Sequence, residues 1–164
     1  MKIPRFLILV FLLCAAACTT GQQTPQTPKP KMLTAADLQK LRWIEGSWRG
    51  TGVNQPPFFE RYRFENDTTL AVDGFDDEQL TKLSDTTRFV LENGEFGGGS
   101  SGARYVATAL DDNSITFEPV IKARNTFIWK RDTKDSWTAI LRTLPTADKP
   151  SKETIYKLER WPKQ

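Results

Sequence analysis

The chain has 164 residues, of which 38% are hydrophobic and 26% charged, and this suits one folded domain of ordinary size. It contains no histidine, which excludes catalytic triads with a histidine base and histidine-ligated haem, and removes the commonest ligand of zinc and copper. The formal net charge of +3 is far below the strongly basic balance of nucleic-acid-binding domains, so no nucleic-acid partner is expected.

The first residues predict an exported protein. Lys2 and Arg5 precede an apolar run at 6–13, which is shorter than the roughly 20 residues of a membrane-spanning helix and is typical of a secretory signal peptide. The small residues that lead into Cys18 resemble the lipobox of bacterial lipoproteins, although Ala15 stands where leucine is usual. The resemblance implies that Cys18 is lipidated and becomes the new N-terminus. The alternative is cleavage after the alanines, which releases a soluble protein with an unpaired thiol.

These features predict three parts of the chain. Residues 1–17 are the signal peptide, residues 18–32 are the lipidated cysteine with a tether rich in Pro, Thr and Gln, and residues 33–164 are the folded domain. Thr19 follows the cysteine, instead of the aspartate associated with retention in the inner membrane. The resemblance therefore implies a cell-envelope protein anchored in the outer membrane and facing the periplasm.

Loss of the signal peptide changes both the charge and the thiol content. Lys2 and Arg5 leave with it and no acid does, so 21 basic side chains remain against 20 acidic ones. Cys14 also leaves, and Cys18 would carry lipid, so the mature chain would have neither a disulfide nor a free thiol. The mature domain must therefore be stabilised by a packed core, and cysteine-based catalysis is not expected.

One short helix is predicted directly after the tether. Thr34 and Asp37 have a capping-box-like spacing, and Leu38 and Leu41 share one face of a helix. After Gly46 the pattern changes to short alternating runs separated by turn residues. We predict strands near 47–53, 58–65, 69–76, 79–83, 86–92, 95–98, 103–110, 114–119, 125–131, 136–143 and 153–161, some of which will merge.

The turn residues predict how these strands are connected. Asn93-Gly94 is the strongest two-residue hairpin signal, because both residues tolerate a positive φ. A run of hairpins favours an all-β fold, an antiparallel up-and-down barrel of about 8–10 strands with one short N-terminal helix, since closure removes exposed strand edges. An open sandwich is the alternative.

One aromatic and one basic residue give the chain a resemblance to the calycin superfamily, which includes the lipocalins and fatty-acid-binding proteins. Trp48, Gly50 and Gly52 share one face of the strand at 47–53, and Arg160 ends the last strand. In calycins the tryptophan of a G-x-W motif in the first strand is covered by a late Arg or Lys side chain. The resemblance implies a lipocalin-like barrel that is closed by Trp48 and Arg160.

Nearly the whole domain also resembles an uncharacterised family of bacterial exported lipocalin-like domains, which reads W-L-x-G-x-W, E-x-W, F-E-N, D-F-P-x-R-I-x-Y and L-x-A in order. W-I-E-G-S-W at 43–48 matches the first motif, residues 60–62 take the E-x-W place, 117–119 the F-E-N place and 137–139 the last. The D-F-P-x-R motif is replaced by I-K-A-R-N-T-F-I-W. The family implies no established activity.

Glu60 is the most informative carboxylate. Phe58, Glu60, Tyr62 and Phe64 alternate onto one face of their strand, so inward aromatic rings would place Glu60 inside the barrel, where a carboxylate needs a partner. The candidate partners are Arg104, Arg124, Arg142 and Arg160. The functional interpretation is a polar anchor in an apolar cavity, and the alternative is a structural ion pair or a position at the barrel rim.

The function predicted from these patterns is non-catalytic binding of a small apolar or amphipathic ligand. The candidate cavity residues are Glu60, Tyr62, Phe64, Tyr105, Trp129 and Arg142. An envelope structural or protein-interaction module with a filled barrel is the alternative, and a hydrolase or isomerase that uses Glu60 with Tyr62 or Tyr105 is a third interpretation.

No catalytic residue, cofactor or metal is assigned. The three acids within F-D-D-E at 75–78 lack the spacing of a calcium-binding loop and predict a solvated turn. The glycine-rich stretch at 97–102 lacks the G-K-[ST] of a phosphate-binding loop and predicts a mobile loop near the barrel mouth, which could gate a cavity.

Overall fold

The computed structural model describes residues 28–99, 102–121, 123–146 and 148–162. The predicted signal peptide, Cys18 and most of the predicted tether lie outside these ranges. Across the described ranges, no helix combines the length and apolarity that a membrane crossing requires.

A short helical segment precedes the strands. It consists of the α-helix α1 (Ala35–Leu38) and the 3₁₀ helix η1 (Gln39–Ile44). The predicted capping box is confirmed, because the backbone N–H of Asp37 donates to Thr34 Oγ1 and the backbone N–H of Thr34 donates to Asp37 Oδ2. Hydrogen bonds to the carboxylate from the Thr34 hydroxyl, at 2.8 Å, and from the Thr34 backbone N–H lower the pKa of Asp37. Leu38, Leu41 and Ile44 are fully buried, so one face of this segment belongs to the core.

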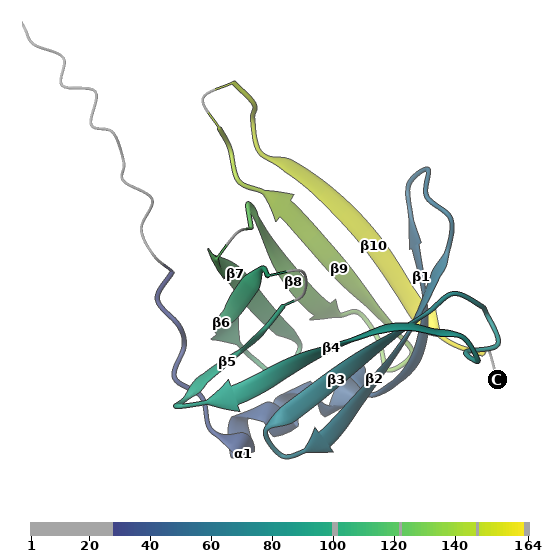
Figure 1. Cartoon of the computed structure of the whole chain (residues 1–164), viewed down its shortest axis with the longest axis horizontal. Helices are drawn as coiled ribbons and strands as arrows, with labels where there is room; N and C mark the ends of the chain where they lie inside the picture. The colour runs from purple at the N-terminus through teal and green to yellow at the C-terminus, as the bar shows by residue number, and fades with distance from the viewer. Residues whose placement is uncertain (1–27, 100–101, 122, 147, 163–164) are drawn as a thin grey trace, which may run out of the picture.

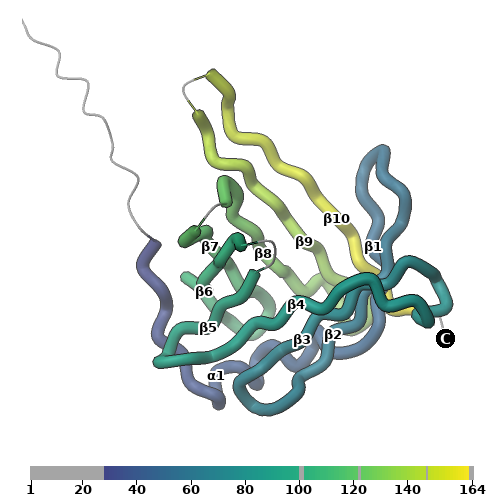
Figure 2. The backbone as a smooth tube through the Cα atoms, in the orientation of Figure 1, coloured from purple at the N-terminus to yellow at the C-terminus, as the bar shows by residue number. Residues whose placement is uncertain are grey.

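Ten antiparallel strands close into a barrel (Figures 1 and 2). Each strand pairs with its neighbours in sequence, and β1 pairs with β10 to complete the ring. The predicted all-β barrel with one short helix is therefore confirmed, and the open sandwich is wrong. The strands are β1 (Gly46–Gly52), β2 (Phe58–Asn66), β3 (Thr69–Phe75), β4 (Leu83–Glu92), β5 (Glu95–Gly98), β6 (Arg104–Leu110), β7 (Ser114–Ile121), β8 (Asn125–Arg131), β9 (Ser136–Thr143) and β10 (Lys152–Arg160).

The connection between β3 and β4 corrects the predicted strand at 79–83. Leu80 has a φ of 58°, which takes the backbone out of the extended region. The carboxylate of Asp77 accepts a hydrogen bond from the backbone N–H of Thr81 at 2.8 Å, and hydrogen bonds from the Thr81 side chain and backbone lower the pKa of Asp77. This turn keeps the chain outside the sheet until β4 begins at Leu83.

The hairpin between β4 and β5 has the predicted turn. Asn93 and Gly94 have φ values of 52° and 83°, and Glu92 pairs with Glu95 across them. The predicted strand at 95–98 is confirmed as β5, so the overlapping expectation that Gly97 and Gly98 belong to a loop is wrong; both residues pair with β4 and β6. A Cβ atom at Gly98 would lie 2.3 Å from the carbonyl oxygen of Arg88, so glycine allows β5 to approach its neighbour closely.

The last residues of the predicted tether are part of the fold. The backbone N–H of Lys31 donates to the carbonyl of Ala107 at 2.8 Å, and that of Leu33 donates to the carbonyl of Gly94 at 2.8 Å. Lys31 Nζ also donates to the carbonyl of Leu110 at 2.9 Å. The folded domain therefore begins before residue 33.

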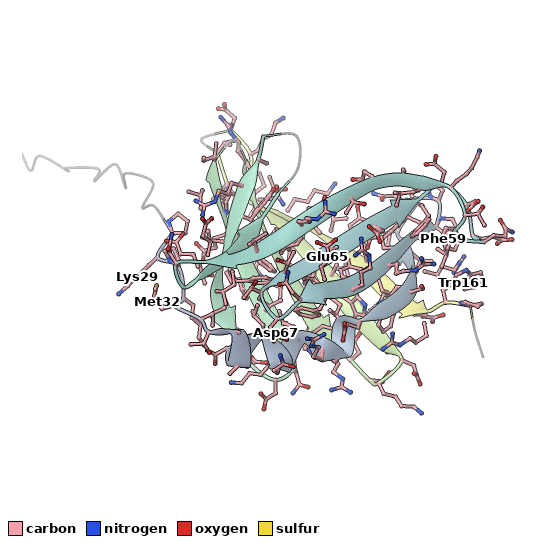
Figure 3. All side chains as sticks on the ribbon, turned by 60° about the horizontal axis from the view of Figure 1, so that its bottom comes forward. Lys29, Met32, Phe59, Glu65, Asp67 and Trp161 are labelled. Atoms are coloured by element: carbon pink, nitrogen blue, oxygen red, sulfur yellow. The ribbon has the colours of Figure 1, made fainter. Side chains whose placement is uncertain are left out.

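The helical segment lies across one end of the barrel, which we call the closed end (Figure 1). Its buried side chains share one hydrophobic cluster with Trp48, Phe96, Phe117 and Trp137. Figure 3 shows Met32, just before this segment, at one side of the molecule, and Phe59 beside Trp161 at the other. The rings of Phe59 and Trp161 are 5.6 Å apart, so the chain after β10 packs on the outside of β2.

Candidate ligand-binding cavity

The closed end is held by Trp48 and Arg160. The indole of Trp48 is 1% exposed, and its Nε1–H donates to the carbonyl of Ile44 at 2.7 Å. The guanidinium carbon of Arg160 lies 3.9 Å from the centre of the Trp48 ring. Arg160 also donates to the carbonyls of Trp43 and Glu45. The last strand, the first strand and the end of η1 are thus joined around one cation–π contact.

Beyond this contact, a glycine makes room for an aromatic ring. A Cβ atom at Gly50 would lie 2.1 Å from the ring of Phe58, so only glycine lets this ring lie across β1. The rings of Phe58 and Tyr156 then meet edge to face, with 5.5 Å between their centres. This pair forms one wall of the space inside the barrel.

That space is a cavity of about 260 Å³, slightly below the roughly 300–1,000 Å³ typical of ligand pockets. Its walls come from strands on both sides of the barrel, and six of its twelve lining residues are aromatic. The lining residues are Phe58, Glu60, Tyr62, Val72, Thr87, Phe89, Trp129, Trp137, Ala139, Leu141, Tyr156 and Leu158.

Three of the aromatic rings support one another. Tyr62 meets both Trp129 and Trp137 edge to face, with 5.5 Å between ring centres in each pair. Trp129 and Trp137 are 6.0 Å apart. These ring contacts stabilise one another and form a continuous part of the cavity wall.

Glu60 is the charged residue of the lining. The hydroxyl of Tyr62 donates to Glu60 Oε2 at 2.8 Å. Burial raises the pKa of Glu60, the hydrogen bond from Tyr62 opposes this rise, and the negative charge of Asp85 adds to it. Burial and the neighbouring Glu60 raise the pKa of Tyr62 well above its usual value. Oxygen Oε1 of Glu60 accepts no hydrogen bond from the described residues.

The structure brings only part of the predicted cavity set together. Glu60, Tyr62 and Trp129 line the cavity. Phe64 does not, because it packs against the core with the guanidinium of Arg42 4.2 Å from its ring centre.

Tyr105 also lies outside the lining. Its ring packs 4.8 Å from that of Phe127, and its hydroxyl donates to Asn125 Oδ1 at 3.0 Å. Burial raises the pKa of Tyr105. Like Phe64, this side chain is partly buried beside the core and does not border the cavity.

The assignment of Arg142 to the cavity is wrong. Trp137, Ala139 and Leu141 are the inward residues of β9, and alternation therefore turns Arg142 outward. There its Nε–H donates to Glu153 Oε1 at 2.9 Å, and its side chain is half exposed.

The expected arginine partner of Glu60 is also not found within the described residues. Arg160 covers Trp48 instead, Arg104 pairs with Glu95 at 3.2 Å on the exposed surface, and Arg124 is exposed. Tyr62 takes the place of the arginine as a neutral hydrogen-bond donor.

Several lining residues were missed at the level of sequence. Trp137, Phe89 and Tyr156 are among them. Because side chains alternate along the strand predicted at 136–143, Trp137 and Arg142 point to opposite faces of the sheet. If the charged Arg142 points outward, Trp137 points inward, so alternation could have identified Trp137. The indole N–H groups of Trp43 and Trp137 are buried, and neither has an acceptor among the described residues.

A larger hollow of about 760 Å³ is formed by the loop before β9 and the end of β10. It is lined mainly by polar and charged side chains, among them Thr133, Lys134 and Asp135, which are exposed. We place the candidate site in the smaller inner cavity, because it combines aromatic walls with one carboxylate. Among the described residues, no three acidic, Cys or His side chains gather as a metal site would require.

No family model and no curated protein matches the chain. One similar solved structure is a redesigned beta barrel, b11L5F_LGL, with 13% sequence identity, a TM-score of 0.34, and coverage of 79% of this chain and 97% of that chain. A second is Rv2717c from M. tuberculosis, with 17% identity, a TM-score of 0.43, and coverage of 78% of this chain and 98% of that chain. A third is EF1p2_mFAP2b bound to DFHBI, with 9% identity, a TM-score of 0.35, and coverage of 74% of this chain and 96% of that chain. At these levels of similarity, the comparisons assign neither a family nor a ligand to the chain.

Proposed function

We propose that this protein is a non-catalytic ligand-binding protein of the bacterial cell envelope, which holds one small apolar or amphipathic molecule inside its barrel. The observation that supports this most strongly is the cavity of about 260 Å³ with its ring of aromatic side chains. A ligand that covers this wall would gain about 25 cal/mol for each Å² of apolar surface removed from water.

The chemistry of the cavity supports binding over catalysis. The Tyr62 hydroxyl is engaged with Glu60, and its raised pKa keeps the phenol protonated at neutral pH. Tyr105, the other tyrosine considered as a partner for Glu60, lies outside the cavity lining. The chain has no histidine, and we identify no side chain beside Glu60 that could form a catalytic pair of nucleophile and general base with it.

A mass measurement tests the binding proposal directly. The purified protein would be examined by native mass spectrometry before and after extraction with organic solvent. We expect an additional small-molecule mass that extraction removes, or saturable quenching of tryptophan fluorescence by added amphipathic ligands. Ala139→Leu, which fills the cavity, should abolish both signals, whereas the surface variant Glu153→Gln should keep them. A clean mass together with no response to any ligand would refute the proposal.

The second part of the proposal is the anchor. The lipobox resemblance supports lipidation of Cys18, with the barrel held at the outer membrane on its periplasmic side. Radiolabelled palmitate fed to expressing bacteria should label the protein, and the label should follow the outer membrane after separation of the membranes. Cys18→Ser should abolish the label and release the protein, with Cys14→Ser as the matched control. Equal labelling of the Cys18→Ser variant would contradict the proposal.

A further inference from the structure

The register of the first strands places two acids on the inner face of the barrel. Glu60 pairs with Trp48 on one side and with Gly74 on the other, and Gly74 pairs in turn with Asp85. Directly paired residues point to the same face of a sheet. Glu60 and Asp85 therefore face the interior from β2 and β4, with Gly74 between them.

Gly74 leaves the space between the two acids open. A Cβ atom at this position would lie 2.5 Å from Asp85 Oδ1, so the carboxylate of Asp85 extends over β3 toward Glu60. The electrostatic effect agrees with this placement, because the charge of Asp85 contributes to the raised pKa of Glu60. One acid thus lines the cavity, and the other is exposed to solvent beside it.

No basic side chain balances these acids among the twelve lining residues. Arg160, which is inward, is held at the closed end by Trp48 and backbone carbonyls. Arg63 of β2 pairs with Asp73 on the outer face, and Arg61 lies 5.0 Å from the ring centre of Phe75. The charged side chains that line the cavity or face it from β4 are therefore both acids, which disfavours a fatty acid or any other anion.

The aromatic walls have the same electrostatic preference. The face of an aromatic ring carries partial negative charge and attracts a cation. Phe58, Tyr62, Phe89, Trp129 and Tyr156 all contribute to the lining, together with Trp137. A carboxylate surrounded by rings is suited to a positively charged group that also carries apolar surface.

We propose that the ligand of this cavity is a small organic cation, whose ammonium group lies against Glu60 and whose apolar body packs among the aromatic rings. This inference rests on the proposed function, since it names the chemical class of the ligand for the same cavity. An ammonium N–H would donate to Glu60 Oε1, the oxygen that Tyr62 leaves free, and a charge-assisted hydrogen bond of this kind is about twice as strong as a neutral one.

A matched set of three compounds tests this inference. 4-Phenylbutylamine, 4-phenylbutanol and 4-phenylbutanoate share one apolar body and differ in an end group that is cationic, neutral or anionic at pH 7.5. Binding to the purified protein would be measured by calorimetry and by tryptophan fluorescence. We expect the amine to bind at least about tenfold more tightly than the alcohol, and the alcohol more tightly than the carboxylate.

The outcomes separate this inference from the proposed function. Binding of all three compounds with equal affinity, or preference for the carboxylate, would overturn the cation inference and leave ligand binding intact. No binding of any compound, by a protein whose circular dichroism shows a folded barrel, would overturn both.

Two variants locate the effect at Glu60. Glu60→Gln keeps the shape and the hydrogen bond with Tyr62 but removes the charge, so the preference for the amine should fall below about threefold while the alcohol still binds. Glu153→Gln makes the same change on the outer surface and should keep the full preference. An unchanged preference in Glu60→Gln would assign recognition of the ammonium to another group and overturn the role of Glu60.

Discussion

The closed end and the cavity lie next to each other on the same strands, yet the closed end is filled with side chains and the cavity is not. Trp48 and Glu60 are directly paired across β1 and β2, but Trp48 is 1% exposed in a filled core, whereas Glu60 borders empty space. The difference arises because α1 and η1 fill one end of the barrel, and in the described residues no comparable segment covers the cavity. We therefore expect stability to be concentrated at the closed end, while the proposed ligand binding uses the cavity.

The largest expected effect comes from emptying the closed end. Trp48→Ala removes the indole, its hydrogen bond to Ile44 and the ring beneath Arg160, and should lower the free energy of unfolding by about 3–5 kcal/mol. Urea unfolding followed by circular dichroism measures this. Ile155→Ala, at an outward residue that is 47% exposed, is the control and should cost less than about 1 kcal/mol. Equal losses in the two variants would mean that the closed end is not the stable part.

Arg160 offers the next largest effect. Arg160→Met keeps much of the apolar stem but loses the cation–π contact and two hydrogen bonds to carbonyls, at a cost of about 2–3 kcal/mol in the same unfolding measurement. Arg142→Met removes the same type of side chain from an exposed ion pair, where the expected cost is about 0–1 kcal/mol. The comparison fails if Arg142→Met proves the more damaging change.

A pair of alanines compares the two regions with a single type of substitution. Ala107 is fully buried in the filled core, and Ala139 lines the cavity. Ala107→Leu should destabilise the protein by about 1–3 kcal/mol through overpacking. Ala139→Leu should leave stability unchanged within about 1 kcal/mol and abolish ligand binding. Thermal unfolding and the binding assay together give both values, and destabilisation of equal size would show that the cavity closes in solution.

The smallest effect is a change in how stability depends on pH. Burial raises the pKa of Glu60 in the folded state above the usual 4.5, so the folded state binds its proton more tightly than the unfolded state. Stability therefore falls as pH rises from about 4.5 through the folded pKa, and it is level above that. Glu60→Gln should remove this decline, which urea unfolding between pH 4 and 8 measures. An identical decline in both proteins would assign it to other groups.

The sequence could predict which face of a strand a residue occupies better than its depth in the barrel. Alternation correctly placed Glu60, Tyr62 and Phe64 inside, but only the first two reach the cavity, because distance along the barrel axis depends on the stagger between strands. The prediction that Tyr105 lines the cavity was wrong for the same reason.

Contacts between strands were out of reach for a different reason. Glu60 and Asp85 lie on the same face on either side of Gly74 through the register of three strands, and no local sequence pattern reveals that register. In contrast, the capping box of Thr34 and Asp37 and the turn at Asn93-Gly94 depend on residues a few positions apart, and both were predictable.

The segment from Lys31 to Glu45 has a dynamic consequence. It is hydrogen-bonded to the β5 and β6 side of the ring at Gly94 and Ala107, and it leads into β1, which lies on the opposite side in the strand order. The segment therefore connects two opposite sides of the barrel across its closed end. We expect the strands to separate there only after its hydrogen bonds to Gly94 and Ala107 break. Amide protons near this end should exchange only through global unfolding, and those around the cavity through local opening. Local opening at the cavity would let the proposed ligand enter and leave while the barrel stays folded.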